Sequence, residues 1–325
     1  MINGMFYMIR RNEYLQHGIV SAVSVFVSAA IILGGTTIRT DATADVFNED
    51  LYVAEQISSI GVYEPDDNKT EIRPGKEKRS IGVFINGKRY NGRAFLYNDT
   101  TYVGIREYSV TLAGAEVSWN GANSTATVRT PKTTVIATKG AEYISANGRY
   151  LWVKNKVLIE DGTMYVPIRQ LSAAFGATVD WNGNDSTVSV IKGSGTITSG
   201  SVYYNADEVY WLSKIIHAES RGESLMGKIA VGNVVLNRKN SPDYPNTIYG
   251  VIFDRKYGVQ FSPVADGSIN LEPNTESVIA AKICLEGYTV SDRILFFVNK
   301  SIAANAWVTS SRPHEVTIGK HDFYA

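Results

Sequence analysis

Apolar residues recur at helical spacing in the segment that ends at Glu219. They are Val209, Leu212, Ile215 and Ile216. Three- and four-residue intervals place them on one buried stripe of a helix, and Glu219 falls on the same face at its C-terminal end. A carboxyl group against apolar surface favours its protonated form, so we expect a raised pKa and a group suited to general acid catalysis. An ion pair of Glu219 with Arg221 or Lys214 on a solvated helix end is the alternative.

More helices are predicted around this one. Asn205 or Asp207 is suited to cap the helix that leads to Glu219, and Ser224 is suited to cap the next helix. A third helix is expected at residues 275–287, and the remainder of the chain has the pattern of strands and loops. Residues 203–325 therefore predict one α+β domain.

A pattern of strand, short helix and hairpin occurs twice in the middle of the chain. Residues 102–121 begin with Tyr-Val-Gly-Ile-Arg and end with Trp-Asn-Gly, and residues 165–183 begin with Tyr-Val-Pro-Ile-Arg and end with the same three residues. An alternating strand follows each Asn-Gly turn, at residues 125–128 and 186–190. Two such units predict a small α+β repeat domain with a shared core at residues 81–192.

Polar segments flank this repeat. Residues 45–80 are charged and show little periodicity, which is typical of a tether. Residues 193–202 are rich in Gly and Ser, which predicts a flexible linker and independent movement of the domains on its two sides.

The N-terminal residues 1–44 have the pattern of an export signal. Arg10 and Arg11 precede an apolar run at residues 19–35, and residues 42–44 form a small-x-small cleavage site. Cleavage there gives a secreted protein. The long leader before the run also leaves a retained membrane anchor open. In either case we expect the rest of the chain outside the cytoplasm.

The amino-acid composition limits the binding partners and the cellular compartment that fit this protein. The chain has 32 Lys and Arg against 32 Asp and Glu, so no basic field attracts nucleic acid. Its single cysteine, Cys284, lies among apolar residues at helical spacing, so we expect it in a core, and no intrachain disulfide is possible. An exported protein without disulfides is typical of a bacterial envelope.

Five blocks of sequence in the last third of the chain carry a resemblance. They are residues 217–223, 227–238, 245–248, 261–267, and 311–313 with 318–321. In the same order, these blocks resemble the SleB-type cell-wall hydrolases, the spore cortex-lytic family. The resemblance covers residues 203–325 and implies a lysozyme- or lytic-transglycosylase-like fold that cleaves the peptidoglycan glycan strand with one essential glutamate. That role falls on Glu219. Ser220, where the family prefers Ala, is a small departure.

A second carboxylate for Glu219 is not evident in these blocks. Glu223 is expected to cap the helix that follows it, and Asp266 before Gly267 is typical of a turn. We therefore favour a lytic transglycosylase mechanism, in which Glu219 protonates the glycosidic oxygen and then deprotonates the C6 hydroxyl of N-acetylmuramic acid to form a 1,6-anhydro ring. A hydrolytic muramidase, which needs a second carboxylate about 5 to 9 Å away, is the alternative.

The remaining candidates are polar or aromatic side chains for substrate binding. They are Glu223, Ser262, Asp266, Trp307, Ser311, Arg312 and His321. Neither serine has the surroundings of a nucleophile. Trp307 and Tyr324 are suited either to line a glycan groove or to pack in a core.

A metal-dependent peptidase or amidase is the competing enzyme class. His314 and His321 have a separation that fits none of the short zinc spacings, so we predict no metal site and no cofactor.

The repeat resembles the copper amine oxidase N-terminal-like domain, which implies targeting or spacing on an exported wall protein. Residues 45–200 contain no His and no Cys, so we expect no copper binding. Trp119 and Trp181 occupy matched positions that are typical of a core, with stacking on sugars as the alternative. Arg106 and Arg169 are expected to pair with the helix that follows each, or else to hold anionic wall polymers.

Taken together, the sequence predicts a monomeric, extracytoplasmic bacterial enzyme that acts on peptidoglycan in wall remodelling or spore cortex lysis. An N-acetylmuramoyl amidase and a non-catalytic wall-binding protein are the alternatives, and the intact block around Glu219 argues against the second.

Overall fold

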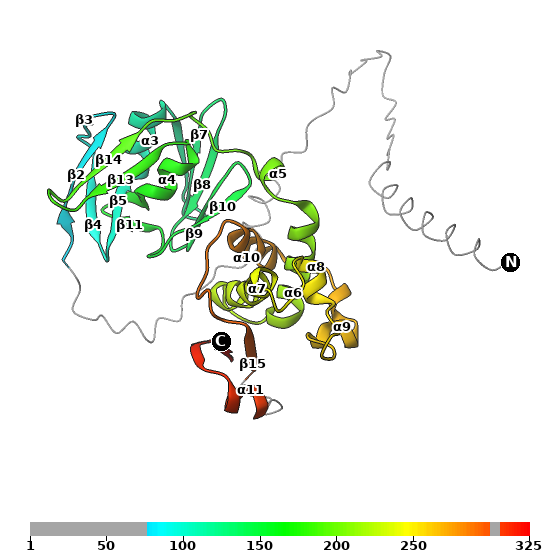
Figure 1. The fold of residues 1–325 in the computed structure, drawn as a ribbon. Coiled ribbons are helices and arrows are strands. Elements are labelled where there is room, and N and C mark those ends of the chain that lie inside the picture. The colour runs from blue at the N-terminus through cyan, green and yellow to red at the C-terminus, as the bar shows by residue number, and fades with distance from the viewer. Residues whose placement is uncertain (1–76, 300–305) are drawn as a thin grey trace, which may run out of the picture. The chain divides into compact units, whose positions relative to one another are not determined.

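The computed structural model describes residues 77–299 and 306–325 of the chain. The expected export signal at residues 1–44, and the expected tether at 45–80 as far as residue 76, lie outside the described residues. Within the described ranges, no helix is long and apolar enough to span a membrane. Figure 1 shows strands predominating from residue 79 to 191 and helices from residue 200 onward. The predicted α+β class is confirmed.

The first region contains fourteen strands and two described helices. In chain order its elements are β1 (Arg79–Ser80), β2 (Gly82–Ile85), β3 (Lys88–Arg89), β4 (Ala94–Tyr97), β5 (Thr100–Gly104), α3 (Ile105–Ala113), β6 (Glu116–Asn120), β7 (Thr125–Arg129), β8 (Thr134–Thr138), β9 (Tyr143–Ala146), β10 (Arg149–Trp152), β11 (Leu158–Glu160), β12 (Thr163–Pro167), α4 (Ile168–Ala174), β13 (Thr178–Asn182) and β14 (Thr187–Ile191). They form three sheets with the strand orders β1-β4-β5-β12-β11, β10-β9-β8-β7-β6 and β13-β14-β2-β3.

The predicted repeat is present as two units of strand, helix and hairpin. β5-α3-β6-β7 is the first unit and β12-α4-β13-β14 is the second. Their leading strands pair antiparallel, with Val103 opposite Val166, and Tyr108 on α3 shares a buried hydrogen bond of 2.5 Å with Ser172 on α4. Gly114 ends α3 with a φ of 62°, a left-handed conformation that glycine adopts without strain. The two units therefore share one core.

The matched tryptophans are the clearest departure from expectation in this region. Trp119 and Trp181 were expected in the core, but their exposures are 48% and 42%. Each lies near the tip of its hairpin on an edge strand, β6 or β13. Val117 and Val179, two residues earlier on the same strand faces, do pack against the core. The core ends before it reaches the two indole rings, so the core interpretation is wrong.

The Gly/Ser segment at residues 193–202 is hydrogen-bonded to the repeat. Thr133 donates its hydroxyl to the Gly195 carbonyl at 3.1 Å, and the Ile197 N–H donates to the Ala174 carbonyl at 3.1 Å. The Gly200 N–H donates to the Asn147 carbonyl at 2.7 Å. Independent movement of the two domains stays a prediction.

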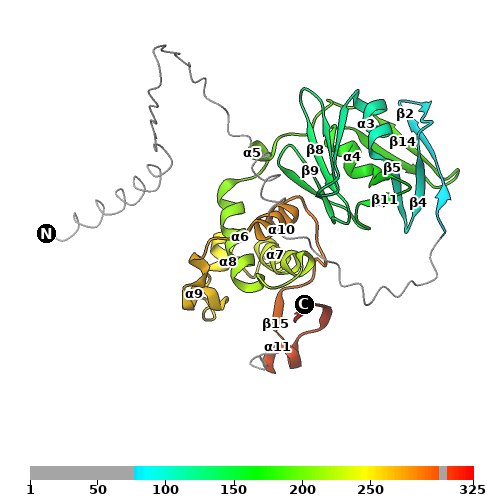
Figure 2. The same cartoon turned by 180° about the vertical axis from the view of Figure 1, so that it is seen from behind.

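The second region is built on three long helices. In chain order its elements are α5 (Gly200–Tyr203), α6 (Ala206–Ser220), α7 (Leu225–Asn240), α8 (Ile248–Ile252), α9 (Ser262–Asp266), the 3₁₀ helix η1 (Ser268–Asn270), α10 (Thr275–Leu285), β15 (Phe296–Asn299), α11 (Ala306–Ser311), β16 (His314–Ile318) and β17 (His321–Tyr324). β17 lies between β15 and β16 in an antiparallel sheet. Figure 2 shows α6, α7 and α10 from behind.

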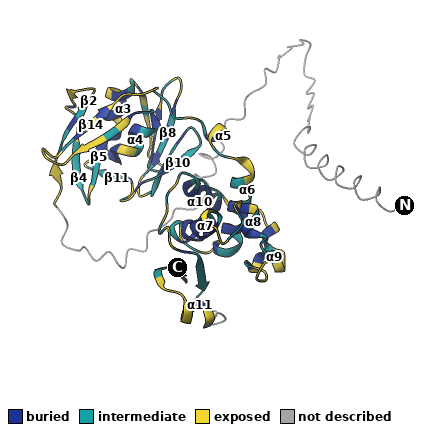
Figure 3. Ribbon diagram, in the orientation of Figure 1, coloured by how far each residue is buried: buried dark blue, intermediate teal, exposed yellow. Residues whose placement is uncertain are grey.

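The three long helices pack closely around a buried core (Figure 3). Gly232 on α7 permits the close approach, because a Cβ there would lie 2.8 Å from the sulfur of Cys284 on α10 and 2.9 Å from Ile216 on α6. Cys284 is buried, as predicted. The predicted caps are also present, since the side chain of Asn205 caps α6 and that of Ser224 caps α7.

Candidate active site

Glu219 lies in the last turn of α6, beyond the buried residues Leu212, Ile215 and Ile216. Burial raises the pKa of its carboxyl group to about 7, and the negative charge of Asp266 acts in the same direction. The raised pKa predicted from the helical stripe is thus present. At neutral pH both the protonated and the ionised form of Glu219 are populated.

Lys214, one of the two partners considered for Glu219, is engaged elsewhere. It is buried on α6, and its ammonium group donates to the Asn270 carbonyl at 3.1 Å and pairs with Glu272 at 3.1 Å. These contacts tie α6 to the segment around η1. Lys214 therefore does not serve as the counter-ion of Glu219.

The turn from α6 into α7 is fixed by local hydrogen bonds. Ser220 donates its hydroxyl to the Ile216 carbonyl at 2.6 Å, so this polar group is satisfied inside its own helix. The Glu223 N–H donates to the Ser220 carbonyl at 2.9 Å. Ser224 then starts α7 by accepting from the Gly227 N–H at 3.3 Å. Because the Ser220 hydroxyl is hydrogen-bonded within its own helix, serine in place of Ala leaves no unpaired buried hydroxyl group.

Arg238, in the last turn of α7, supplies a positive charge to the site. Its Nε donates to the Leu295 carbonyl at 2.7 Å, and its guanidinium carbon lies 5.1 Å from the ring of Phe261 and 5.3 Å from that of Phe296. Arg238 is almost fully buried and lowers the pKa of Glu219, against the effect of burial. Arg238 therefore favours the carboxylate form of Glu219.

Asp266 is the other charged group that acts on Glu219. It ends α9, a helix that packs against α6, and its carboxylate accepts from the Ser268 N–H at 2.8 Å. Hydrogen bonds from Ser268 lower the pKa of Asp266, so it is ionised where Glu219 titrates. The predicted turn is present, with Gly267 at a φ of 83°. Ser262 begins the same helix and is exposed.

Glu223 does not cap α7 with its side chain, contrary to expectation. Its carboxylate turns to the β16–β17 hairpin, where it accepts from the Lys320 N–H at 3.2 Å and lies 4.0 Å from Nδ1 of His321. Ser224 takes the capping position instead. Burial lowers the pKa of His321, which favours its neutral form. The hydrogen bond from Lys320 to Glu223 thus links the C-terminal hairpin to the turn after α6.

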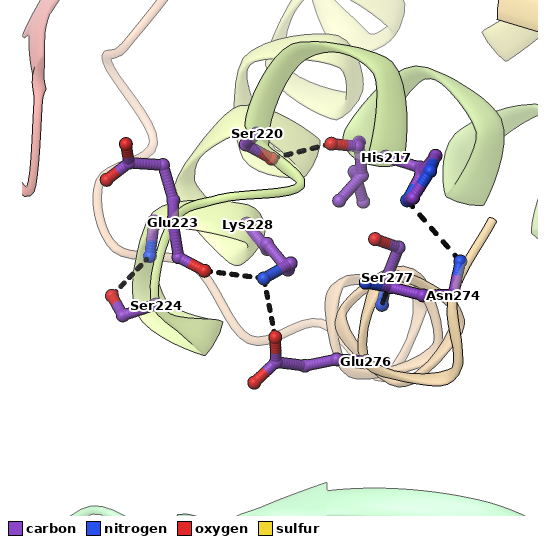
Figure 4. Close-up of polar contacts among 10 residues, drawn as sticks. His217, Ser220, Glu223, Ser224, Lys228, Asn274, Glu276 and Ser277 are labelled. Carbon is purple, nitrogen blue, oxygen red and sulfur yellow. Dashed lines mark hydrogen bonds and ion pairs between the residues drawn. The ribbon is translucent and has the colours of Figure 1, made fainter. Parts of the chain in front are cut away.

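A buried lysine holds the other side of this turn (Figure 4). Lys228 on α7 donates to the Glu223 carbonyl and forms an ion pair with Glu276 on α10. His217 on α6 accepts the Asn274 N–H on Nδ1 at 3.4 Å, and burial lowers its pKa. Contacts to α10 therefore hold the end of α6 that carries Glu219.

Trp307, Ser311 and Arg312 lie together at α11. Trp307 is 59% exposed, and its ring packs edge-on to Phe296 with centroids 5.9 Å apart. The guanidinium carbon of Arg312 lies 4.7 Å from the ring of Phe296 and 5.3 Å from that of Trp307. Ser311 donates its hydroxyl to the Trp307 carbonyl within the helix. Tyr324 is buried, so its core alternative is the correct one.

The predicted residues thus fall into three groups. Glu219 and Asp266 interact electrostatically, Glu223 contacts His321, and Trp307 lies with Arg312. Arg238 connects the first group to the third, because it acts on Glu219 and its guanidinium lies near Phe296, which Arg312 also contacts.

Arg238 was not among the site residues predicted from the sequence. Arg238 lies seven residues after Val231 and four residues after Val234, on the face of the helix that both valines bury. A charged residue at such a position was the available signal.

Across residues 77–299 and 306–325, no three His, Cys, Asp or Glu side chains cluster closely enough to hold a metal ion.

Comparison with protein families places two known domains on this chain. The Cell Wall Hydrolase family matches residues 222–324, and the Copper amine oxidase N-terminal domain matches residues 84–190. The first match begins after Glu219, so it does not itself include this residue.

Similar proteins share the same C-terminal region. A spore cortex-lytic enzyme of Bacillus cereus is 36% identical over 120 residues, which is 37% of this chain and 45% of the relative. The spore cortex-lytic enzyme of Bacillus subtilis is 35% identical over 120 residues, which is 37% of this chain and 38% of the relative. The chain therefore spans less than half the length of these relatives.

Solved structures of isolated catalytic domains are also similar. The catalytic domain of the germination-specific lytic transglycosylase SleB from Bacillus anthracis is 34% identical, with a TM-score of 0.35, and the match covers 40% of this chain and all of that domain. The catalytic domain of the Bacillus cereus SleB protein is 35% identical, with a TM-score of 0.34, and the match covers 38% of this chain and 92% of that domain. By the family matches, residues 222–324 form a cell wall hydrolase domain, and a copper amine oxidase N-terminal domain at residues 84–190 precedes it.

Proposed function

We propose that this protein cleaves the glycan strand of peptidoglycan as a lytic transglycosylase, with Glu219 as its catalytic acid and base. The observation that carries the proposal is the carboxyl group of Glu219 at the end of a buried helical stripe, with a pKa of about 7. A group with this pKa gives up and regains a proton near neutral pH, as a single residue in both roles must. Membership of the cell wall hydrolase family supports the substrate.

The reaction balances with one carboxyl group. Glu219 donates its proton to the glycosidic oxygen, and the bond from this oxygen to C1 of N-acetylmuramic acid breaks. The neighbouring sugar leaves with a free hydroxyl group. The Glu219 carboxylate then takes the proton of the C6 hydroxyl, whose oxygen bonds to C1 and closes the 1,6-anhydro ring. Glu219 ends the cycle protonated, and neither water nor a cofactor is consumed.

Charges around Glu219 suit both halves of this cycle. Burial and the negative charge of Asp266 favour the protonated form that starts the reaction. The buried guanidinium of Arg238 favours the carboxylate that forms once the proton has left. Because both charges are fixed in place before the substrate arrives, little reorganisation is needed during the reaction.

A hydrolytic muramidase is the second candidate, and Asp266 is the residue that favours it. It is an ionised carboxylate that acts on Glu219, as the second acid of a glycosidase does. Its side chain, however, is exposed and bonded to Ser268 in a turn, which is a poor position for activating a water molecule. We therefore rank hydrolysis below transglycosylation.

The chemistry of the new chain ends tests the proposal. Purified sacculi from vegetative cells and from spore cortex are digested side by side, and the soluble fragments are analysed by mass spectrometry. We expect 1,6-anhydromuramic ends, which are lighter than reducing ends by one water. Reducing muramic ends as the main product would instead support the hydrolase, and release of peptides from intact glycan would support the amidase.

The same digestion identifies the substrate. Spore cortex differs from vegetative wall in its muramic lactam, and the relatives named spore cortex-lytic enzymes support cortex as the substrate of this chain. Faster release from cortex than from vegetative sacculi is the expected result. We also expect a monomer that acts outside the cytoplasm, where peptidoglycan lies.

A further inference from the structure

The two exposed tryptophans of the repeat domain are held by the same local structure. Asn120 accepts the Ala122 N–H at 3.0 Å after Trp119, and Asn182 accepts the Asn184 N–H at 3.0 Å after Trp181. In both hairpins the next residue is a glycine. A Cβ on either glycine would lie 3.6 Å from Nε1 of the indole, so each ring lies against its own turn. Exposure of Trp119 and Trp181 is therefore a feature built twice into the domain.

Polar groups surround the first of these rings. Trp119 lines a pocket of about 250 Å³ together with Arg93, Arg106, Glu107 and Thr163. Arg93 pairs with Glu107 at 3.1 Å and also donates to the hydroxyl of Thr163. The backbone N–H of Arg93 donates to the same carboxylate at 2.8 Å. The wall of the pocket therefore presents hydrogen-bond donors and acceptors beside the flat apolar face of the indole.

The second repeat presents a related arrangement. Arg169, which matches Arg106, donates to the Val179 carbonyl at 2.7 Å, two residues before Trp181 on the same strand. This contact replaces the ion pair expected for Arg169. The side chain ties the start of α4 to the strand that carries the exposed ring, so Trp181 too has a guanidinium group close to its strand.

An exposed indole ring beside paired charged groups fits a sugar better than it fits an anionic polymer or an apolar partner. A sugar ring has apolar C–H faces that stack on an indole, and hydroxyl groups at its edge that bond to carboxylate and guanidinium groups. Of the three charged residues in the pocket, Arg93 and Glu107 form an ion pair, so the field that would attract an anion is weaker than two arginines alone would give. Two exposed indole rings at matched positions also suit a polymer of repeating sugars, because simultaneous binding at two weak sites raises the overall affinity.

We infer that the repeat domain is a glycan-binding module in which Trp119 and Trp181 stack on sugar rings of the peptidoglycan strand. The choice of peptidoglycan rests on the function proposed above. The module holds the chain on its polymeric substrate while the C-terminal domain cleaves, which gives the domain a role without copper.

A sedimentation assay tests this inference on the full chain. Glu219→Gln, present in all samples, prevents cleavage, and sacculi stripped of anionic polymers are the ligand. Trp119→Ala with Trp181→Ala should weaken binding about tenfold or more. This is the usual effect of removing aromatic side chains that become buried when a complex forms. Trp119→Phe with Trp181→Phe, which keeps the flat faces, should stay within about threefold of the parent. Val110→Ala removes another exposed apolar side chain of the domain and serves as the matched control.

The outcomes separate this inference from the proposed function. Unchanged binding of the double Ala variant, or an equal loss in Val110→Ala, would overturn the glycan module. Binding that depends on salt and not on the two tryptophans would point to an anionic polymer and would also overturn it. The proposed function is judged by the chain ends made by the active protein, so either result can fail alone. Thermal unfolding of each variant shows whether it is folded.

Discussion

The guanidinium group of Arg238 acts on the carboxyl group of Glu219 from the end of a different helix, and it opposes the effect of burial on a pKa whose net value is about 7. Burial and the charge of Asp266 on one side, and the charge of Arg238 on the other, thus set the proton affinity of the proposed catalytic acid. Desolvation is the largest of these effects, and the charge of Arg238 keeps the carboxylate form accessible near neutral pH.

Replacing Arg238 by Met should raise the pKa of Glu219, because a positive charge that favours the carboxylate is removed. The alkaline limb of the kcat/KM profile, which reports loss of the protonated acid, should move to higher pH. Met retains the packing against Phe261 and Phe296. Arg312→Met, which also removes a charge beside Phe296, is the matched control and should leave the limb in place.

Glu219→Gln should lower activity by at least about 100-fold, because an amide cannot cycle a proton. Digestion of sacculi followed by mass spectrometry measures this loss. Glu272→Gln changes an exposed carboxylate of the same region and should retain activity. Substantial activity in Glu219→Gln would remove this residue from the mechanism.

The same substitution should change how stability depends on pH. The pKa of Glu219 is raised from 4.5 to about 7 in the folded state, so its favourable contribution is full below pH 4.5 and is lost as pH rises through 7. The loss amounts to about 3 kcal/mol. Relative to wild type, Glu219→Gln should therefore be more stable at pH 8 than at pH 5. Urea unfolding at the two pH values measures this difference, and an equal offset at both would contradict the raised pKa.

Glu223→Ala should destabilise the C-terminal hairpin, because the backbone N–H of Lys320 loses its acceptor on the Glu223 carboxylate. The expected loss is about 0.5–1.5 kcal/mol in the free energy of unfolding, the usual net contribution of one hydrogen bond. Glu223→Gln retains a carbonyl oxygen and should lose much less. Gly319→Ala provides an independent check, since φ is 58° there and a Cβ would meet the Glu223 carboxylate. Comparable stability of Glu223→Ala and wild type would assign the carboxylate another role.

Gly232→Ala tests the close packing of the three long helices. The added methyl group meets the sulfur of Cys284 and the side chain of Ile216, so we expect a loss of about 1–3 kcal/mol in unfolding free energy, although Ala favours helix more than Gly does. Cys284→Ala in the same chain removes one of the two obstacles and should recover part of the loss. A purely additive double variant in denaturant unfolding would show that the two side chains do not meet.

The sequence alone determined the features that depend on neighbouring residues. Helical spacing located α6 and the raised pKa of Glu219, side-chain chemistry located the caps at Asn205 and Ser224, and internal similarity located the two repeat units. These features were predictable because periodicity, capping and turn preferences act over a few residues. The cell wall hydrolase domain was also identifiable from the sequence, since each block that carries the resemblance is a short run of consecutive residues.

Tertiary structure alone decided which groups meet across long separations. Glu223 and Lys320 are 97 positions apart, and only the packing of the β16–β17 hairpin turns the carboxylate away from the helix it was expected to cap. Arg238 acts electrostatically on Glu219 only because α6 and α7 pack together. Trp119 is exposed because the core ends at Val117, a boundary set by neighbouring elements. Local patterns in the sequence do not predict these long-range contacts, because the helices and strands that meet are far apart in the chain.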